Sequence, residues 1–144
     1  MHYLGYCYEN GIGTGINEQK AFEWYQKAAN LGDAFRMNNF GCCYDNGIGT
    51  SINKQKAFEF YQKAANLGVA FGMNNLGYCY ENGIGTNVDK QKAFELYQKA
   101  ANLGNDSAQY ILAYMYEMGN EIWNKQFIGI ENLQNKNVKV LKIN

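Results

Sequence analysis

Three glycine-rich segments are the first part of the sequence that could do chemistry. Residues 8–14 read YENGIGT, residues 44–50 read YDNGIGT, and residues 80–86 read YENGIGT again. A glycine-rich loop ahead of a helix can bind a phosphate through its backbone N–H groups. A nucleotide-binding loop also needs a buried strand before it and a Lys-Ser or Lys-Thr ending, which these segments lack. We therefore interpret the first glycine of each segment as the end of a helix.

The four cysteines could form disulfides or react as thiols. Cys7, Cys43 and Cys79 recur at intervals of 36 residues, which places them about 10 Å apart if the repeats stack as helices. A disulfide needs Cα atoms within about 7 Å, so we expect these three to be small buried side chains. Cys42 is predicted to project from the exposed face. It is the one thiol that could be reactive, and an ordinary free thiol is the alternative.

Catalytic side chains are scarce in this sequence. His2 is the one histidine in the chain, and neither Ser51 nor Ser107 has a histidine partner. A Ser-His-Asp triad therefore cannot be assembled within one chain. We predict that the protein is not an enzyme and that it has no catalytic residue, no cofactor and no metal site.

The charge balance argues against a nucleic-acid partner. Thirteen basic residues match thirteen acidic ones among 144 residues, and no run of Lys or Arg occurs. A protein that binds phosphate backbones would need such a run or a basic surface, so we expect no nucleic acid. No stretch approaches the roughly 20 apolar residues of a membrane span, and the start of the chain lacks a signal-peptide pattern. We expect a cytoplasmic protein without membrane insertion.

An internal repeat of 36 residues must position all these side chains. Residues 1–36, 37–72 and 73–108 are closely similar to one another, and proline is absent. In the second copy, apolar residues at helical spacing predict a first helix over 34–46 and a second helix over 54–66, joined by the glycine-rich segment. The predicted N-caps of the second helices are Asn17, Asn53 and Asp89, and the predicted glycines at their C-terminal ends are Gly32, Gly68 and Gly104.

The second helix of each repeat has a broad apolar face. Between residues 21 and 31, the apolar side chains cover about half of the helix circumference. A helix with so wide a face must contact more than one neighbour, as helices do in a solenoid of stacked pairs. The pairs Ala28-Ala29, Ala64-Ala65 and Ala100-Ala101 would let neighbouring helices approach closely.

The third copy shows the residue pattern of the repeat clearly. It contains Leu76-Gly77, Tyr80, Gly83-Ile84-Gly85, Asp89, Lys92-Ala93, Tyr97, Lys99-Ala100-Ala101 and Gly104. This pattern closely resembles the Sel-one-like repeat, a relative of the tetratricopeptide repeat. The resemblance implies an all-α fold, a right-handed α/α solenoid of helix-turn-helix repeats with a period of 36 residues. It also implies an adaptor that gathers other proteins rather than a catalyst.

The predicted domain organisation is a stack of repeats followed by a tail. Residues 1–119 form the stack, and residues 120–144 are predicted as a degenerate fourth second helix, a C-terminal cap and a tail. The units of the stack are predicted at about 1–36, 37–72 and 73–108, with a fourth first helix at 108–119. The segment from Val138 to the end has no assigned role.

The exposed face of the first helices is the predicted partner-binding surface. In solenoids of the tetratricopeptide type this helix lines the concave side, and stacking turns equivalent residues into columns. Amides, tyrosines and acids form three columns here, and tyrosine in particular gives a large contact area at low entropic cost. The predicted binding residues are Tyr6, Glu9, Asn38, Asn39, Cys42, Asp45, Asn74, Asn75, Tyr78, Glu81, Tyr114 and Glu117.

The predicted function is a protein-interaction scaffold or adaptor that binds a protein or peptide segment on its concave face. Signalling and the assembly of an enzyme complex are the settings that the resemblance suggests. Several alternatives stay open. Near-identical repeats copy surface residues into columns even without a binding role, and the chain could be a structural or fragmentary module that docks end to end on another chain or copy. Disulfide-rich bacterial relatives considered as β-lactam binders leave a hydrolase or small-ligand binder as the most distant alternative.

Overall fold

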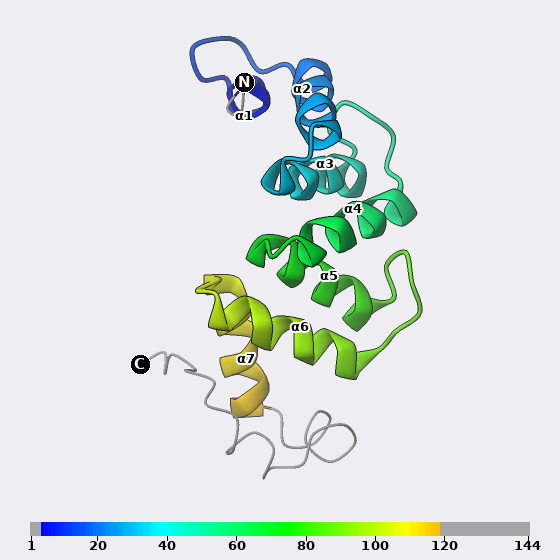
Figure 1. Cartoon of the computed structure of the whole chain (residues 1–144), viewed down its shortest axis with the longest axis vertical. Coiled ribbons are helices and arrows are strands. Elements are labelled where there is room, and N and C mark those ends of the chain that lie inside the picture. Colours follow the sequence, from blue (N-terminus) through cyan, green and yellow to red (C-terminus); the bar gives the residue numbers. More distant parts are fainter. Residues whose placement is uncertain (1–3, 119–144) are drawn as a thin grey trace.

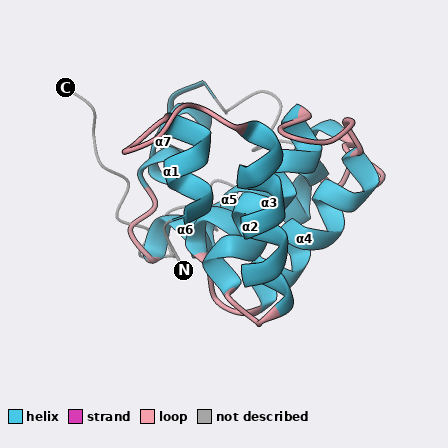
Figure 2. Cartoon of the chain, turned by 90° about the horizontal axis from the view of Figure 1, so that it is seen from above, coloured by secondary structure: helices cyan, strands magenta, loops and turns pink. Residues whose placement is uncertain are grey.

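The structure is a computed structural model that describes residues 4–118 of the chain. These residues form seven helices joined by loops, and none of them lies in a strand (Figure 1, Figure 2). The helices are α1 (Leu4–Asn10), α2 (Glu18–Asn30), α3 (Ala34–Asn46), α4 (Lys54–Asn66), α5 (Ala70–Asn82), α6 (Lys90–Asn102) and α7 (Asp106–Met118). The predicted all-α fold class is confirmed.

The helices stack one after another along the long axis of the molecule (Figure 1). Each helix packs against the one before it and the one after it in the chain. The first and second helices of three repeats are α1 and α2, α3 and α4, and α5 and α6, while α7 is the first helix of a fourth repeat. A solenoid of helix-turn-helix repeats is therefore the observed architecture, as predicted.

The helices begin and end where the sequence predicts. The bounds of α3 and α4 are the predicted ones. Asn53 begins α4 because its side chain accepts the N–H of Lys56 at 3.0 Å, and Asn17 and Asp89 act in the same way for α2 and α6. The glycines that follow the second helices have φ between 87° and 89°, the left-handed conformation expected of Gly32, Gly68 and Gly104.

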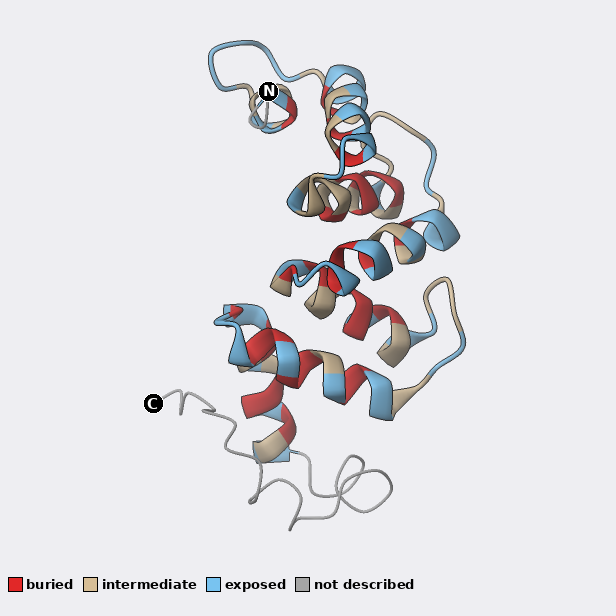
Figure 3. Ribbon diagram, viewed as in Figure 1, coloured by how far each residue is buried: buried red, intermediate tan, exposed pale blue. Residues whose placement is uncertain are grey.

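The core runs along the stack, between neighbouring helices (Figure 3). Tyr61 and Tyr97 on the second helices are at most 2% exposed. A Cβ added to Gly41 would lie 2.9 Å from the ring of Tyr61, and one added to Gly77 would lie 2.9 Å from the ring of Tyr97. Only glycine allows the ring to approach the first helix this closely. The contact places each tyrosine against the first helix of its own repeat.

The alanine pairs lie where successive repeats meet. Ala64 and Ala100 are fully buried. At the contact between α4 and α5, a Cβ on Gly72 would lie 2.8 Å from the Cβ of Ala64. The helices therefore approach as closely as the alanine pairs predict, and a larger side chain at either position would collide with the neighbouring helix.

Helix α7 begins at Asp106 rather than at the predicted residue 108, and it is described as far as Met118.

Some predictions concern residues that the structure does not describe. The degenerate helix, cap and tail predicted at 120–144 lie outside the described residues, and so does His2. These assignments stay predictions.

Candidate functional site

Three tyrosines are exposed on the first helices. Tyr6 of α1, Tyr78 of α5 and Tyr114 of α7 are 49%, 52% and 55% exposed. They occupy equivalent positions of the first, third and fourth repeats, and Cys42 has this position in the second repeat. About half of each tyrosine side chain is exposed to solvent.

Two acids of the predicted column bind a buried tyrosine of the neighbouring helix. The hydroxyl of Tyr25 on α2 donates a hydrogen bond to Glu9 on α1 at 2.5 Å, and Tyr97 on α6 donates to Glu81 on α5 at 2.6 Å. Both acids are half-buried. The prediction that they face outward is therefore wrong in part, because one carboxylate oxygen of each is turned toward the second helix of its repeat.

Both carboxylate oxygens of Asp45, in the second repeat, have a partner. One carboxylate oxygen accepts the hydroxyl of Tyr61 at 3.1 Å, and the other lies 2.6 Å from the Nζ of Lys54. Glu117 differs from the other acids, because it is exposed on α7.

The three tyrosines that bind these acids remain hydrogen-bond donors. Burial raises the pKa of Tyr25, Tyr61 and Tyr97 far above the ordinary value of a tyrosine. Neighbouring groups, including the hydrogen-bonded acid, raise the pKa further. The hydroxyls therefore stay protonated at physiological pH, and each one orients a carboxylate on the first helix.

The asparagines of the predicted amide column, Asn38, Asn39, Asn74 and Asn75, are partly buried. Asn38 of α3 is 7% exposed, and its Oδ1 accepts a hydrogen bond from the Nδ2 of Asn75 on α5 at 2.9 Å. This bond links the first helices of successive repeats. The predicted exposure of Asn38 is therefore wrong, because its amide pairs with the next repeat. Asn39 is half-buried.

Asn74 lies where this pairing stops. It corresponds to Asn38, but its buried Oδ1 has no hydrogen-bond partner among residues 4–118. The donor would come from position 111, where the fourth repeat has Ile111 instead of an asparagine. A buried acceptor is thus left unsatisfied because an apolar side chain occupies the place of its donor.

Cys42 is less exposed than the sequence indicates. Its Sγ lies 3.5 Å from the hydroxyl of Tyr61 and 3.9 Å from the Nδ2 of Asn75. Burial raises the pKa of the Cys42 thiol, so the reactive thiolate form is disfavoured. The prediction that this side chain projects from the exposed face is wrong, because the second helix of its repeat and the next repeat both cover it.

The remaining cysteines are small, mostly buried side chains, as predicted. Cys43 and Cys79 are each 1% exposed, and burial raises the pKa of both thiols to about 12. Cys7 is half-buried. All four cysteines are free thiols, so equivalent positions of successive repeats are not joined by disulfides.

The glycine-rich segments are turns, and some of the backbone N–H groups in and after them are already bonded. Gly47 follows α3 with a φ of 70°, and the N–H of Ile48 bonds to the carbonyl of Cys43 at 2.9 Å. The N–H of Asn53 bonds to the carbonyl of Tyr44 at 2.8 Å, and the other two segments repeat both bonds. These N–H groups therefore cannot hold a phosphate. The interpretation of the first glycines as helix ends is confirmed.

The described residues offer neither a metal site nor a membrane-spanning helix. Residues 4–118 hold no group of three or more His, Cys, Asp or Glu side chains that could bind a metal ion. No helix in the same range is long and apolar enough to cross a membrane.

Family comparison agrees with the repeat architecture. The family model of the Sel1 repeat matches the chain four times, over residues 1–33, 37–69, 70–105 and 106–124. The chain belongs to the Sel1 repeat family. The family inferred from the sequence pattern is thus confirmed, and the fourth match includes α7. No curated protein matches the chain.

Solved structures of other Sel1 repeat proteins resemble this one. The protective antigen c5321 of uropathogenic Escherichia coli, which displays an SLR fold, is 35% identical with a TM-score of 0.76, over 82% of this chain and 25% of its own. A Sel1 repeat protein from Oxalobacter formigenes is 31% identical with a TM-score of 0.78, over 83% and 47%. The cysteine-rich protein B of Helicobacter pylori is 32% identical with a TM-score of 0.62, over 67% and 72%.

These relatives differ from the chain in length. The chain spans a quarter of the Escherichia coli protein and about half of the Oxalobacter protein. Sel1 repeats are typically scaffolds for protein–protein interaction and are generally not catalytic.

Proposed function

We propose that the first helices of the repeats form a surface that binds a segment of a partner protein. The observation that carries this proposal is the row of half-exposed tyrosines, Tyr6, Tyr78 and Tyr114, in a family that typically binds proteins. Tyrosine offers a large contact area and loses little side-chain entropy on binding. Signalling and the assembly of an enzyme complex are the settings that we propose for such a scaffold.

Contacts between repeats support a concave surface on this side of the stack. Among equivalent helices within residues 4–118, α3 and α5 make the most extensive contact, and the bond from Asn75 to Asn38 crosses it. Repeats that approach through their first helices form a stack that curves toward them, and a concave surface can enclose an extended or helical segment. Asn38 and Cys42 have a supporting role in this proposal, because they hold α5 against α3 from below the surface.

The acids give the proposed surface its chemical preference. Glu9, Asp45 and Glu81 are oriented by tyrosine hydroxyls, and Glu117 is exposed on α7. Oriented carboxylates favour basic side chains and N–H donors, because hydrogen bonds to a charged acceptor are the strong ones. The proposed partner is therefore an extended or helical protein segment that presents such groups.

Affinity capture with the intact chain tests the proposal. Replacing both Tyr78 and Tyr114 with alanine removes exposed aromatic area and leaves the core intact, so we expect the specific partner proteins to be lost. The control replaces Ile16 and Ile52 with alanine, because these side chains are 69% and 61% exposed and lie in the loops that follow α1 and α3, not on the first helices themselves. The control should retain all partners. Equal capture by the tyrosine variant and the intact chain would overturn the proposal.

A further inference from the structure

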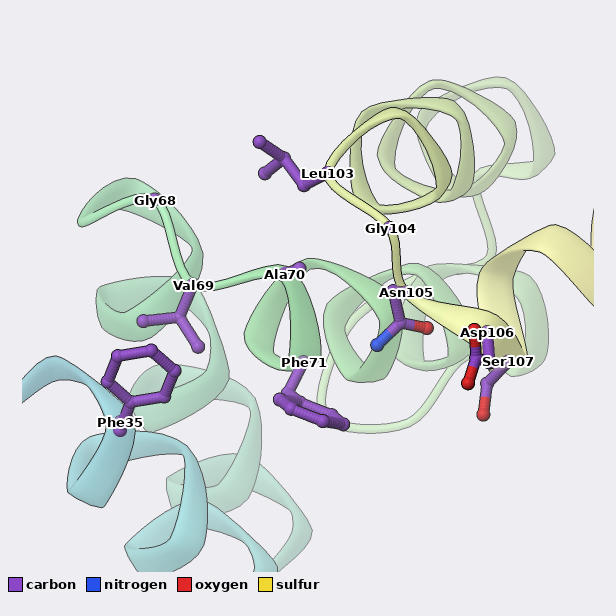
Figure 4. A pocket seen from close by; sticks show the side chains of 10 residues that line it. All are labelled: Phe35, Gly68, Val69, Ala70, Phe71, Leu103, Gly104, Asn105, Asp106 and Ser107. Atoms are coloured by element: carbon purple, nitrogen blue, oxygen red, sulfur yellow. The ribbon is translucent and has the colours of Figure 1, made fainter. Parts of the chain in front are cut away.

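A pocket of about 520 Å³ lies on the edge of the stack where second helices pass into first helices (Figure 4). Phe35 comes from the start of α3, Phe71 from the start of α5, and Leu103 follows the end of α6. The pocket therefore spans three successive junctions between repeats, and only the stack can form it. The glycine-rich segments are elsewhere, in the loops at the other end of these helices.

The walls of this pocket are apolar and open to solvent. Phe35, Phe71 and Leu103 are 59%, 61% and 59% exposed. Val69 is buried in the middle junction, where the other two junctions have a polar residue. A small molecule is usually buried over most of its surface, which side chains this exposed do not provide. A group of exposed apolar side chains on one edge is instead typical of a protein-binding surface.

One hydrogen-bond donor, on the mostly buried residue Asn105, points into the pocket. Asn105 is 6% exposed, and its Oδ1 accepts the N–H of Ala108 at 2.9 Å. Its Nδ2 has no hydrogen-bond partner among residues 4–118, and Figure 4 shows that it points toward Ala70 and Phe71. An amide NH2 that faces the pocket can donate a hydrogen bond to an incoming acceptor. The backbone carbonyl of a bound protein segment is such an acceptor.

Asp106 gives the pocket its charge. Its carboxylate is exposed in the first turn of α7, and it is the one charged side chain among the described residues that line the pocket. A carboxylate at the edge of an apolar surface attracts a cation and repels an anion. A complementary ligand therefore carries an apolar side chain next to a lysine or an arginine.

We propose that this edge is a second docking site, which binds an extended protein segment with an apolar residue next to a lysine or arginine. The apolar side chain of the segment packs against Phe71 and Leu103, and a backbone carbonyl of the segment accepts a hydrogen bond from the Nδ2 of Asn105. The cation lies near Asp106. The site does not include the tyrosine surface of the first helices, so its test is independent of the function proposed above.

Titration of the folded chain followed by nuclear magnetic resonance tests the site with a defined probe. The probe is the acetylated and amidated peptide Gly-Ser-Leu-Lys-Ser-Gly. We expect the backbone amide signals of Phe71, Leu103 and Asp106 to shift, with a dissociation constant on the order of millimolar. Peptides with Ser in place of Leu, or with Glu in place of Lys, should bind about tenfold more weakly. Shifts confined to other residues, or equal binding of the three peptides, would overturn the proposal.

Two leucines at equivalent positions provide matched variants. Leu103→Ser should weaken binding of the peptide about tenfold, because it removes an apolar wall of the pocket. Leu31→Ser should leave binding unchanged, because Leu31 is 75% exposed and does not line the pocket. Phe71→Ser gives a second wall variant, and Asp106→Asn should remove the preference for lysine over glutamate. Equal effects of the two leucine variants, or an unchanged preference in Asp106→Asn, would overturn the proposal.

A second copy of the chain is the competing occupant of this edge. Light scattering separates it from the proposed segment. We expect the intact chain and Leu103→Ser to have the same molar mass in solution. A dimer of the intact chain that Leu103→Ser dissociates would mean that the pocket binds another copy, and this result would overturn the proposal.

Discussion

A tyrosine hydroxyl in each complete repeat connects the core to the surface that we propose as the binding site. The apolar face predicted between residues 21 and 31 includes Tyr25, and the acids were predicted on the exposed face, but the bond between tyrosine and acid was not predicted. A signal was present, because in all three repeats the tyrosine follows the acid by 16 residues. A buried hydroxyl needs a hydrogen-bond partner, and the acid near the end of the first helix is within its reach.

Tyr97→Phe removes one of these bonds and keeps the ring in the core. It leaves Glu81 half-buried without its donor, so the free energy of unfolding should fall by about 1 to 3 kcal/mol. Urea denaturation measures this change. The control is Tyr110→Phe, because Tyr110 is 60% exposed and should change the free energy by less than about 0.5 kcal/mol. A loss in Tyr97→Phe no larger than in the control would contradict the structure.

Two buried thiols make the free energy of unfolding depend on pH in the alkaline range. The pKa of Cys43 and Cys79 is raised to about 12 in the folded protein, against about 8.5 in an unfolded chain. Above pH 8.5 or so, the unfolded chain loses thiol protons that the folded protein keeps, so rising pH favours unfolding. Between about pH 9 and pH 12 the free energy of unfolding should fall by up to about 1.4 kcal/mol per thiol for each pH unit.

Urea denaturation at about pH 7 and about pH 9.5 measures this effect before tyrosines begin to contribute. The double variant Cys43→Ala and Cys79→Ala removes both thiols, and its stability should fall less between the two pH values. Buried tyrosines add a loss of the same sign above about pH 10, which is why the upper pH is kept below that value. Identical pH dependence in the two proteins would show that these thiols titrate in the same way folded and unfolded.

The ends of the helices could be predicted from the sequence, but the burial of some side chains on the helix faces could not. Asn53 and Gly47 mark the start of α4 and the end of α3 through local bonds, which depend on sequence alone. The burial of Asn38 and Cys42 depends on α5, which belongs to the next repeat and bonds to both side chains through Asn75. A single-helix pattern cannot show which part of an exposed face the next repeat covers.

The loops inside the second and third repeats also pack on the preceding repeat. A Cβ on Gly85 would lie 2.6 Å from the carbonyl oxygen of Lys54 and 2.7 Å from the Cβ of Phe58 on α4. Gly13 has the equivalent position and a similar φ of 71°, but a Cβ there would meet nothing within 4 Å. The two glycines thus share a backbone conformation and differ in their surroundings.

Alanine substitutions separate these two effects. Gly13→Ala and Gly85→Ala both place alanine in the left-handed conformation, which should cost about 1 to 2 kcal/mol. Gly85→Ala should cost about 1 to 3 kcal/mol more, because its Cβ collides with α4. Thermal denaturation of the two variants measures the difference. Equal losses of stability would mean that the loop does not rest on the preceding repeat.

For the whole molecule, the period of the sequence predicted the stack, because each broad apolar helix face needs neighbours on two sides. The pocket on the edge was not predictable in the same way. Its apolar walls, Phe35, Phe71 and Leu103, come from three different junctions and meet only after the repeats stack. The exposure of Tyr6, Tyr78 and Tyr114 follows from the repeat, because equivalent residues of a regular repeat have similar surroundings.

Site-specific photo-cross-linking decides whether the first helices face a partner protein. A photoreactive phenylalanine replaces either Tyr78 on α5 or Gln62, which is exposed on the second helix α4, in cells that naturally express the chain. We expect covalent adducts with a partner protein from position 78 and none from position 62. No adduct from position 78, or adducts from position 62 alone, would contradict a protein-binding surface on the first helices.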